Sequence, residues 1–288
     1  MPWTLSTTLD DFRTQAVGFL AAHPAENTVL LTAADRLAAR GPRFYGDGAP
    51  LFGWWRPEPD GEVEGAFVWT PPFVPRLGLM PERAAAGLAV ELAGGGAGAG
   101  PTPITGVGGG VAAVRAFGAA WAGSTGVTGT VRTSERLYRL GELTGPPRPP
   151  AGRSRLAGPA DRELLIRWFE EFAAEADALL PNVAKAVDDR TADGRLHLWE
   201  DAGRPVAVAG ASAVVAGMSR LGPVYTPAEA RGRGYASAVT AAASAAALAG
   251  GAAEVLLYTD LSNPTSNSIY QQIGYRPVED CLELAFGT

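Results

Sequence analysis

The sequence predicts a mixed α/β protein built from two tandem domains, each with helices packed on a mixed sheet. Three observations carry this prediction. The chain has 288 residues, 47% of them hydrophobic, which allows two modest domains with buried cores at roughly 150 residues per domain. A segment rich in proline and glycine divides the chain near its middle. Helix and strand patterns then follow a similar order in both halves.

The dividing segment reads Gly-Pro-Pro-Arg-Pro-Pro-Ala-Gly at residues 145–152. Proline lacks a backbone N–H and its ring fixes the backbone, so this segment can form neither a helix nor a central strand. We therefore expect a first domain at 1–144, a linker at 145–153 and a second domain at 154–288.

The second half carries the clearer pattern. A helix is expected at 161–175, where apolar side chains recur three to four residues apart: Leu164, Leu165, Trp168, Phe169 and Phe172. Strands rich in valine and alanine then flank a tight turn. The expected order after the first helix is strands at 196–200, 205–215 and 218–226, a helix at 234–249, a strand at 254–259, a helix at 266–273 and a strand at 281–286.

The first half shows a blurred version of this order, which predicts a degenerate structural repeat. Its expected elements are helices at 9–20 and 28–39, strands at 51–56, 63–70 and 76–80, a helix at 81–92, a short strand at Ile104, a helix at 111–121 and strands at 128–132 and 136–140.

Composition excludes several classes of protein. The single cysteine, Cys281, allows no intramolecular disulfide, and two histidines leave little for metal ligation, so we expect no metal site. The net charge of -6 argues against sequence-independent nucleic-acid binding, which needs a basic surface. No signal peptide and no apolar run of about 20 residues is seen, so we expect a cytoplasmic protein without a membrane segment.

The strongest local signal is a glycine-containing loop at 226–234, which leads from a predicted strand directly into a helix. Glycines let backbone N–H groups converge on a ligand, and the helix start adds unpaired donors and a positive dipole end. Arg231 and Arg233 can add charge. The lysine of a Walker A loop is missing, and the loop does not fit a dinucleotide fingerprint. The segment therefore predicts a site for another phosphate-bearing anion.

This loop resembles the pyrophosphate loop of the GNAT (Gcn5-related) N-acetyltransferase superfamily, Gln/Arg-x-x-Gly-x-Gly/Ala, with Arg231, Gly234 and Ala236 at the three positions. A second stretch, at 258–275, is similar to the closing motif of that family. There Asn263 follows a strand, Tyr270 ends a short helix, and Gly274 with an aromatic residue follows. The resemblance covers residues of about 155 to 288.

The resemblance implies an acyl-CoA N-acyltransferase fold, in two tandem copies, and an enzyme that transfers an acetyl group from acetyl-CoA to a primary amine by direct attack. Tyr270 would protonate the departing CoA thiolate, since a phenol of ordinary pKa about 10 is protonated at neutral pH. In this family the third strand, expected here at 218–226, splays from the next strand, and Asn263 would hold the pantetheine from the side opposite it. The remaining residues implied to bind the cofactor are Val224, Tyr225 and Thr226 at the pantetheine and Arg231, Gly232, Arg233, Gly234, Tyr235, Ala236 and Ser237 at the pyrophosphate.

Several alternatives stay open at this point. The general base could be Glu171, Glu175 or a water chain. The protein could instead be a non-enzymatic regulator that binds acyl-CoA, or, less in keeping with the missing lysine, a nucleotide-binding protein. In the first half, the run Gly106–Gly110 could be a vestigial pyrophosphate loop. Because this half lacks the remaining motif residues, we expect it not to bind the cofactor.

Overall fold

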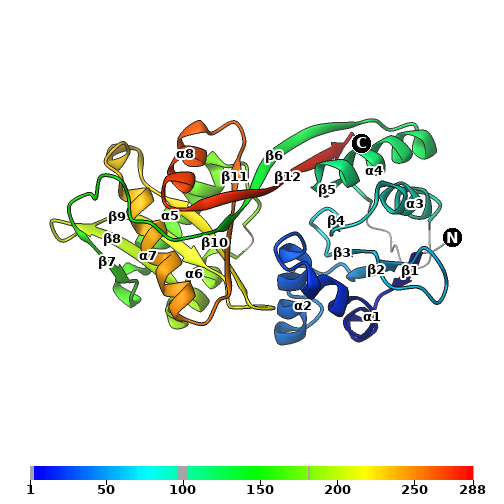
Figure 1. Cartoon of the computed structure of the whole chain (residues 1–288), viewed down its shortest axis with the longest axis horizontal. Coiled ribbons are helices and arrows are strands. Elements are labelled where there is room, and N and C mark those ends of the chain that lie inside the picture. The colour runs from blue at the N-terminus through cyan, green and yellow to red at the C-terminus, as the bar shows by residue number, and fades with distance from the viewer. Residues whose placement is uncertain (1–2, 96–102, 181, 288) are drawn as a thin grey trace. The chain divides into compact units, whose positions relative to one another are not determined.

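The computed structural model describes residues 3–95, 103–180 and 182–287 (Figure 1). The chain forms two compact units, Met1–Leu137 with Val278–Thr288, and Tyr138–Pro277. The division therefore falls inside two strands. The proline-rich segment at 145–153, where a linker is expected, lies wholly within the second unit.

The first half of the chain begins with a short strand and two helices, continues with three strands, and ends in a helix, strand, helix and long strand. These elements are β1 (Trp3–Ser6), α1 (Leu9–Ala22), α2 (Thr28–Arg40), β2 (Leu51–Trp55), β3 (Gly65–Trp69), β4 (Arg76–Leu77), α3 (Glu82–Ala93), β5 (Gly106–Gly110), α4 (Val111–Thr125) and β6 (Gly129–Leu140).

The second half of the chain repeats this order, with two 3-10 turns in addition. It contains β7 (Arg153–Leu156), the 3-10 turn η1 (Pro159–Asp161), α5 (Arg162–Glu175), α6 (Val183–Ala192), β8 (Leu196–Asp201), β9 (Arg204–Ala211), β10 (Met218–Tyr225), the 3-10 turn η2 (Ala228–Ala230), α7 (Tyr235–Ala249), β11 (Glu254–Asp260), α8 (Pro264–Gln272) and β12 (Tyr275–Phe286). The two halves thus share one architecture although their sequences differ.

Each sheet is completed by a strand from the other half of the chain. In the first unit the strands lie in the order β1-β2-β3-β4-β5-β12, and β12 pairs with β5 antiparallel from Cys281 to Ala285. In the second unit the order is β7-β8-β9-β10-β11-β6. The closing strands are therefore exchanged, which is why a cut in the proline-rich segment does not separate two complete sheets.

Helices cover both faces of the second sheet. Along β9, Ala207, Ala209 and Ala211 point into a core with α7 and α8, whereas Val208 points into a core with α5 and α6. Successive strand residues face opposite sides, so this alternation separates the two cores. The first unit follows the same plan, with α3 and α4 on one face and the Phe12–Phe52 stack of α1 on β2 on the other.

Most predicted elements are confirmed, and five elements differ from the prediction. The predicted strands at 128–132 and 136–140 are one strand, β6, and the strand expected at Ile104 is the glycine run of β5. The edge strands β1 and β7 and the helix α6 have little apolar periodicity, and the sequence did not indicate them. None of the helices in the described ranges is both long and apolar enough to cross a bilayer.

His197 on β8 provides a test of side-chain burial in the second unit. It is 8% exposed, and burial lowers its pKa from 6.5. Near pH 6.5 only the unfolded chain takes up a proton at this side chain. The contribution of neutral His197 to the free energy of unfolding is therefore complete above that pH and is lost as the pH falls below it. We expect the unfolding free energy, measured by urea titration between pH 7.5 and 5, to fall less steeply in His197→Gln than in the wild type. If the unfolding free energy depends on pH equally in the two proteins, His197 is not kept neutral by burial.

Candidate functional site

The candidate site begins where β10 and β11 separate. The two strands pair in parallel from Met218 to Leu221 against Glu254 to Leu257, and their pairing ends there although both strands continue. On the β9 side the register of β10 shifts between Leu221 and Val224. Beyond Leu221, β10 therefore presents an unpaired edge to β11 over its last residues. An extended ligand can add to such an edge through its amides.

The loop after β10 is shaped by two glycines with left-handed backbone, Gly232 at φ 76° and Gly234 at φ 83°. Side-chain-bearing residues adopt this conformation at a cost, so glycine is favoured at both positions. Two left-handed glycines on either side of Arg233 can turn neighbouring N–H groups toward one side, which is the arrangement of an anion-binding nest. The loop opens directly into α7 at Tyr235.

The backbone N–H groups of residues 232–237 donate to no acceptor in the described part of the chain. No side chain caps α7. Ser237, in the first turn, is 5% exposed, and its Oγ also lacks a partner among the described residues. Buried donors are normally paired, so this concentration of unpaired donors at the positive end of a 15-residue helix fits a bound anion.

The side chain of Arg231 is already engaged. Its guanidinium donates to both carboxylate oxygens of Glu175 at 2.8 and 2.7 Å and through Nε to the Thr226 carbonyl at 2.9 Å. It also lies over the Tyr225 ring, 5.8 Å from the centroid. The expected charge contribution of Arg231 is therefore largely neutralised by Glu175, and its main role is to tie α5 to the start of the loop.

Tyr225 faces α5, on the side of the sheet opposite α7. It packs with Trp168 and Phe169, and its hydroxyl donates to Glu171 at 2.9 Å. Burial, followed by the bond to Glu171, raises the pKa of Tyr225 to about 12. The side chain of Tyr225 is therefore engaged with α5, and its backbone is what remains to bind the cofactor. Of the two candidate bases, Glu175 is bound to a cation, whereas Glu171 has no ion pair among the described residues.

Tyr235, the first residue of α7, is 4% exposed, and its hydroxyl bonds to the carboxylate of Asp201 at the end of β8. That bond, more than burial, raises the pKa of Tyr235. The contact fastens the helix start to the β8–β9 turn. Tyr235 therefore contributes a backbone N–H to the loop, while its side chain stabilises the fold through the bond to Asp201.

Tyr270 lies on α8 in the same core as Leu221 and Tyr235, with Val224 packed against it. It is 8% exposed and packs edge-on to Tyr275 with ring centroids 6.1 Å apart. Burial raises the pKa of Tyr270 to about 12, so its phenol stays protonated well above neutral pH. The fold thus brings Tyr270 to the same layer as the open end of β10.

Asn263 is the N-cap of α8. Its Oδ1 accepts from the backbone N–H of Ser266 at 3.0 Å, which satisfies one of the free donors of the helix start. The side-chain oxygen is therefore used by the fold, and only the amide NH₂ could contact a ligand.

The sequence did not indicate Tyr138, which comes from β6 in the first half of the chain. It is fully buried, its hydroxyl donates to Asn267 at 2.9 Å, and it accepts from Gln271 at 3.0 Å. Both partners lie on α8, beside Tyr270. Its distance in sequence from the motifs explains why only the strand exchange reveals it, and the only hint in the sequence is an aromatic residue in a predicted strand.

Among the described residues of the first unit there is no comparable loop. Its counterpart, between β4 and α3, contains Pro81, whose carbonyl accepts from Ala84 and Ala85 at 2.9 and 3.2 Å, and Glu82 adds a carboxylate to the first turn. The interpretation of Gly106–Gly110 as a vestigial pyrophosphate loop is wrong. These glycines form β5, and the side chain of Arg76 crosses it to reach Glu283 at 3.1 Å because Gly108 has no side chain.

Titratable side chains suited to a metal do not gather in threes anywhere in the described ranges. The site is built instead from backbone donors, a serine hydroxyl, two buried phenols and the carboxylates of α5. This arrangement can bind a phosphate-bearing ligand with an extended amide-containing arm and can supply a proton from a phenol.

Comparisons with known proteins agree with this geometry. The model of the FR47-like protein family matches residues 204–283, which include β9, β10, the loop, α7, β11 and α8. A comparison with curated proteins finds no match.

Similar solved structures extend the likeness to the whole chain. A GNAT-family acetyltransferase from Colwellia psychrerythraea is 14% identical with a TM-score of 0.61, and 100% of each chain is covered. A GCN5-related N-acetyltransferase from Sphaerobacter thermophilus is 16% identical with a TM-score of 0.63, covering 98% of this chain and 94% of that one. One from Kribbella flavida is 17% identical with a TM-score of 0.52, covering 78% and 87%. The chain therefore has the GNAT acyl-CoA N-acyltransferase fold, and residues 204–283 carry the pattern of the FR47-like family.

Proposed function

We propose that the protein is an acetyl-CoA-dependent N-acetyltransferase that acts on a primary amine, with its site in the unit Tyr138–Pro277. The observation that carries this proposal is the run of unpaired N–H groups at residues 232–237, placed directly after the strand whose edge is open. A pyrophosphate joined to an amide-containing arm matches both features at once.

The binding residues divide by the part of the cofactor they would meet. The pyrophosphate would lie on the nest from Gly232 to Ser237, with Arg231 holding the start of the loop through its bond to the Thr226 carbonyl. The backbone of Val224, Tyr225 and Thr226 would pair with the pantetheine amides along the open edge. Asn263 could add its amide NH₂ from α8, because its Oδ1 is used in the helix cap.

Acetyl-CoA supplies an activated thioester, and the chain has to position it, accept a proton from the amine and return one to the sulfur. Tyr270 is the proton donor we assign, since its buried phenol is protonated at all pH values at which the protein is expected to work. Glu171 is better placed than Glu175 to accept the proton of the amine, because Glu175 is held by Arg231.

The first test is calorimetry with CoA and acetyl-CoA, followed by a screen of primary amines with thiol detection. We expect one binding site per chain, since the described residues of the first unit form no comparable loop, and release of free thiol that depends on an amine. Binding without amine-dependent release would favour an acyl-CoA-binding regulator over an enzyme. Absence of binding would contradict the proposal.

A further inference from the structure

The proline-rich segment at 145–150 is held at both ends to the second unit. Before it, Thr144 donates from its backbone N–H to the Ile273 carbonyl at 3.1 Å and from Oγ1 to the Gln272 carbonyl at 2.9 Å. After it, the Ala151 carbonyl accepts from Nε1 of Trp199 at 2.9 Å. Four prolines lie between these anchors and restrict the backbone further. The segment is therefore a fixed strap.

This strap passes beside the start of α7. A Cβ placed on Gly234 would stand 3.6 Å from the Arg148 carbonyl oxygen and 3.8 to 3.9 Å from the ring of Pro150. Gly234 is the N-cap of α7 and lies in the middle of the unpaired donors. Arg148 is thus carried on the strap to the edge of the proposed pyrophosphate site.

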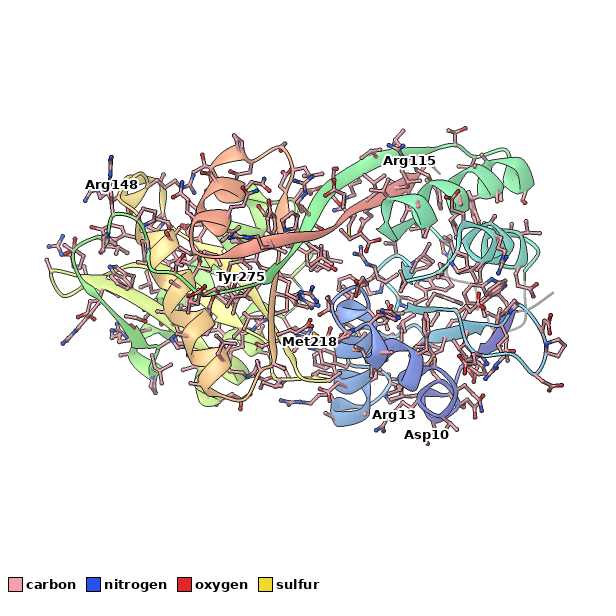
Figure 2. The ribbon with its side chains drawn as sticks, viewed as in Figure 1. Asp10, Arg13, Arg115, Arg148, Met218 and Tyr275 are labelled. Atoms are coloured by element: carbon pink, nitrogen blue, oxygen red, sulfur yellow. The ribbon has the colours of Figure 1, made fainter. Side chains whose placement is uncertain are left out.

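Arg148 is the only charged residue between Gly145 and Gly152. Its side chain is exposed (Figure 2), and no described residue pairs with its guanidinium. A lone cation beside the positive end of a helix is repelled by it unless an anion lies between them. An anionic ligand would therefore satisfy three features at once: the unpaired N–H groups, the buried Oγ of Ser237 and this arginine.

We propose that Arg148 binds a phosphate group of the CoA moiety, either the pyrophosphate or the 3′-phosphate of the ribose. This inference rests on the proposed function, and it names a residue outside the loop motif. A guanidinium matches phosphate oxygens with two N–H donors. Because both anchors and the prolines hold the strap in place, little of its backbone freedom is lost on binding.

The test compares the affinities of CoA and 3′-dephospho-CoA for the wild type, Arg148→Ala and Arg148→Lys by calorimetry. We expect Arg148→Ala to weaken CoA binding about fivefold to tenfold, with partial recovery in Arg148→Lys. A loss seen for CoA and absent for 3′-dephospho-CoA assigns the contact to the 3′-phosphate. An equal loss for both ligands assigns it to the pyrophosphate.

Arg153→Ala is the matched control. Arg153 lies five residues away, its side chain is 81% exposed, and it forms a long ion pair of 4.0 Å with Glu200. If Arg153→Ala weakens CoA binding as much as Arg148→Ala does, the effect is one of general charge and the contact is overturned. Unchanged affinity in Arg148→Ala also overturns it. If the wild type itself binds no CoA, the proposed function fails and this inference falls with it.

Discussion

Replacing Ala236 with Glu is expected to weaken acetyl-CoA binding by at least about a hundredfold while leaving the fold intact. Ala236 is the second residue of α7 and is partly exposed, so the larger side chain has room. Its carboxylate would accept the free N–H groups of residues 232–237 and repel the phosphates that we assign to them. A negative charge in the first turn also stabilises a helix, by about 0.3 to 1 kcal/mol.

The measurement is calorimetric affinity for acetyl-CoA together with thermal unfolding. Ala245→Glu is the control, since Ala245 is an exposed residue in the middle of the same helix. We expect Ala236→Glu to lose binding without a lower melting temperature and Ala245→Glu to bind like the wild type. Retained affinity in Ala236→Glu would place the phosphates elsewhere.

Replacing Tyr270 with Phe is expected to lower kcat by about a hundredfold to a thousandfold, with little change in acetyl-CoA affinity. The substitution removes a buried hydroxyl that makes no hydrogen bond to the described residues, and it keeps the ring that packs on Tyr275. Proton transfer by a positioned side chain contributes about this much to a rate. The measurement is steady-state thiol release with an amine found in the acceptor screen.

Two controls separate proton donation from packing. Tyr275→Phe removes another buried phenol, one that bonds to Ser244 at 2.8 Å, and should keep most of the activity. Burial raises the pKa of Tyr270 to about 12, so the wild-type rate should show no loss from Tyr270 ionisation between pH 8 and 10. Equal losses in both variants would show that packing, not an acid, is being removed.

Local patterns in the sequence were enough for much of the fold. The apolar spacing of α5, the alanine-rich α7 and the valine-rich strands of the meander were placed within a few residues of their positions in the structure. The loop motif could also be recognised, because two glycines and the start of a helix determine the backbone conformation within one short stretch. These features depend on neighbours in the chain, and periodicity records them directly.

Edge strands and the partners of exchanged strands could not be predicted from local sequence patterns. β7 is short and mostly exposed or half-buried, so it has no apolar alternation to detect. The exchange of β6 and β12 depends on which distant strand offers a pairing edge, and both strands look the same in sequence whichever partner they choose. Tyr138 consequently reaches α8 from the other half of the chain.

By itself, the sequence determined the class of fold, the repeated order of elements, the loop at 226–234 and the phenol of Tyr270 on a short helix. Only the tertiary structure decided that Glu175 forms an ion pair with Arg231, that Asn263 caps α8 and that Arg148 lies beside Gly234. The reason is physical. Backbone conformation follows from neighbouring residues, whereas the partner of a charged or polar side chain is chosen among groups that are distant in sequence and meet only after the chain has folded.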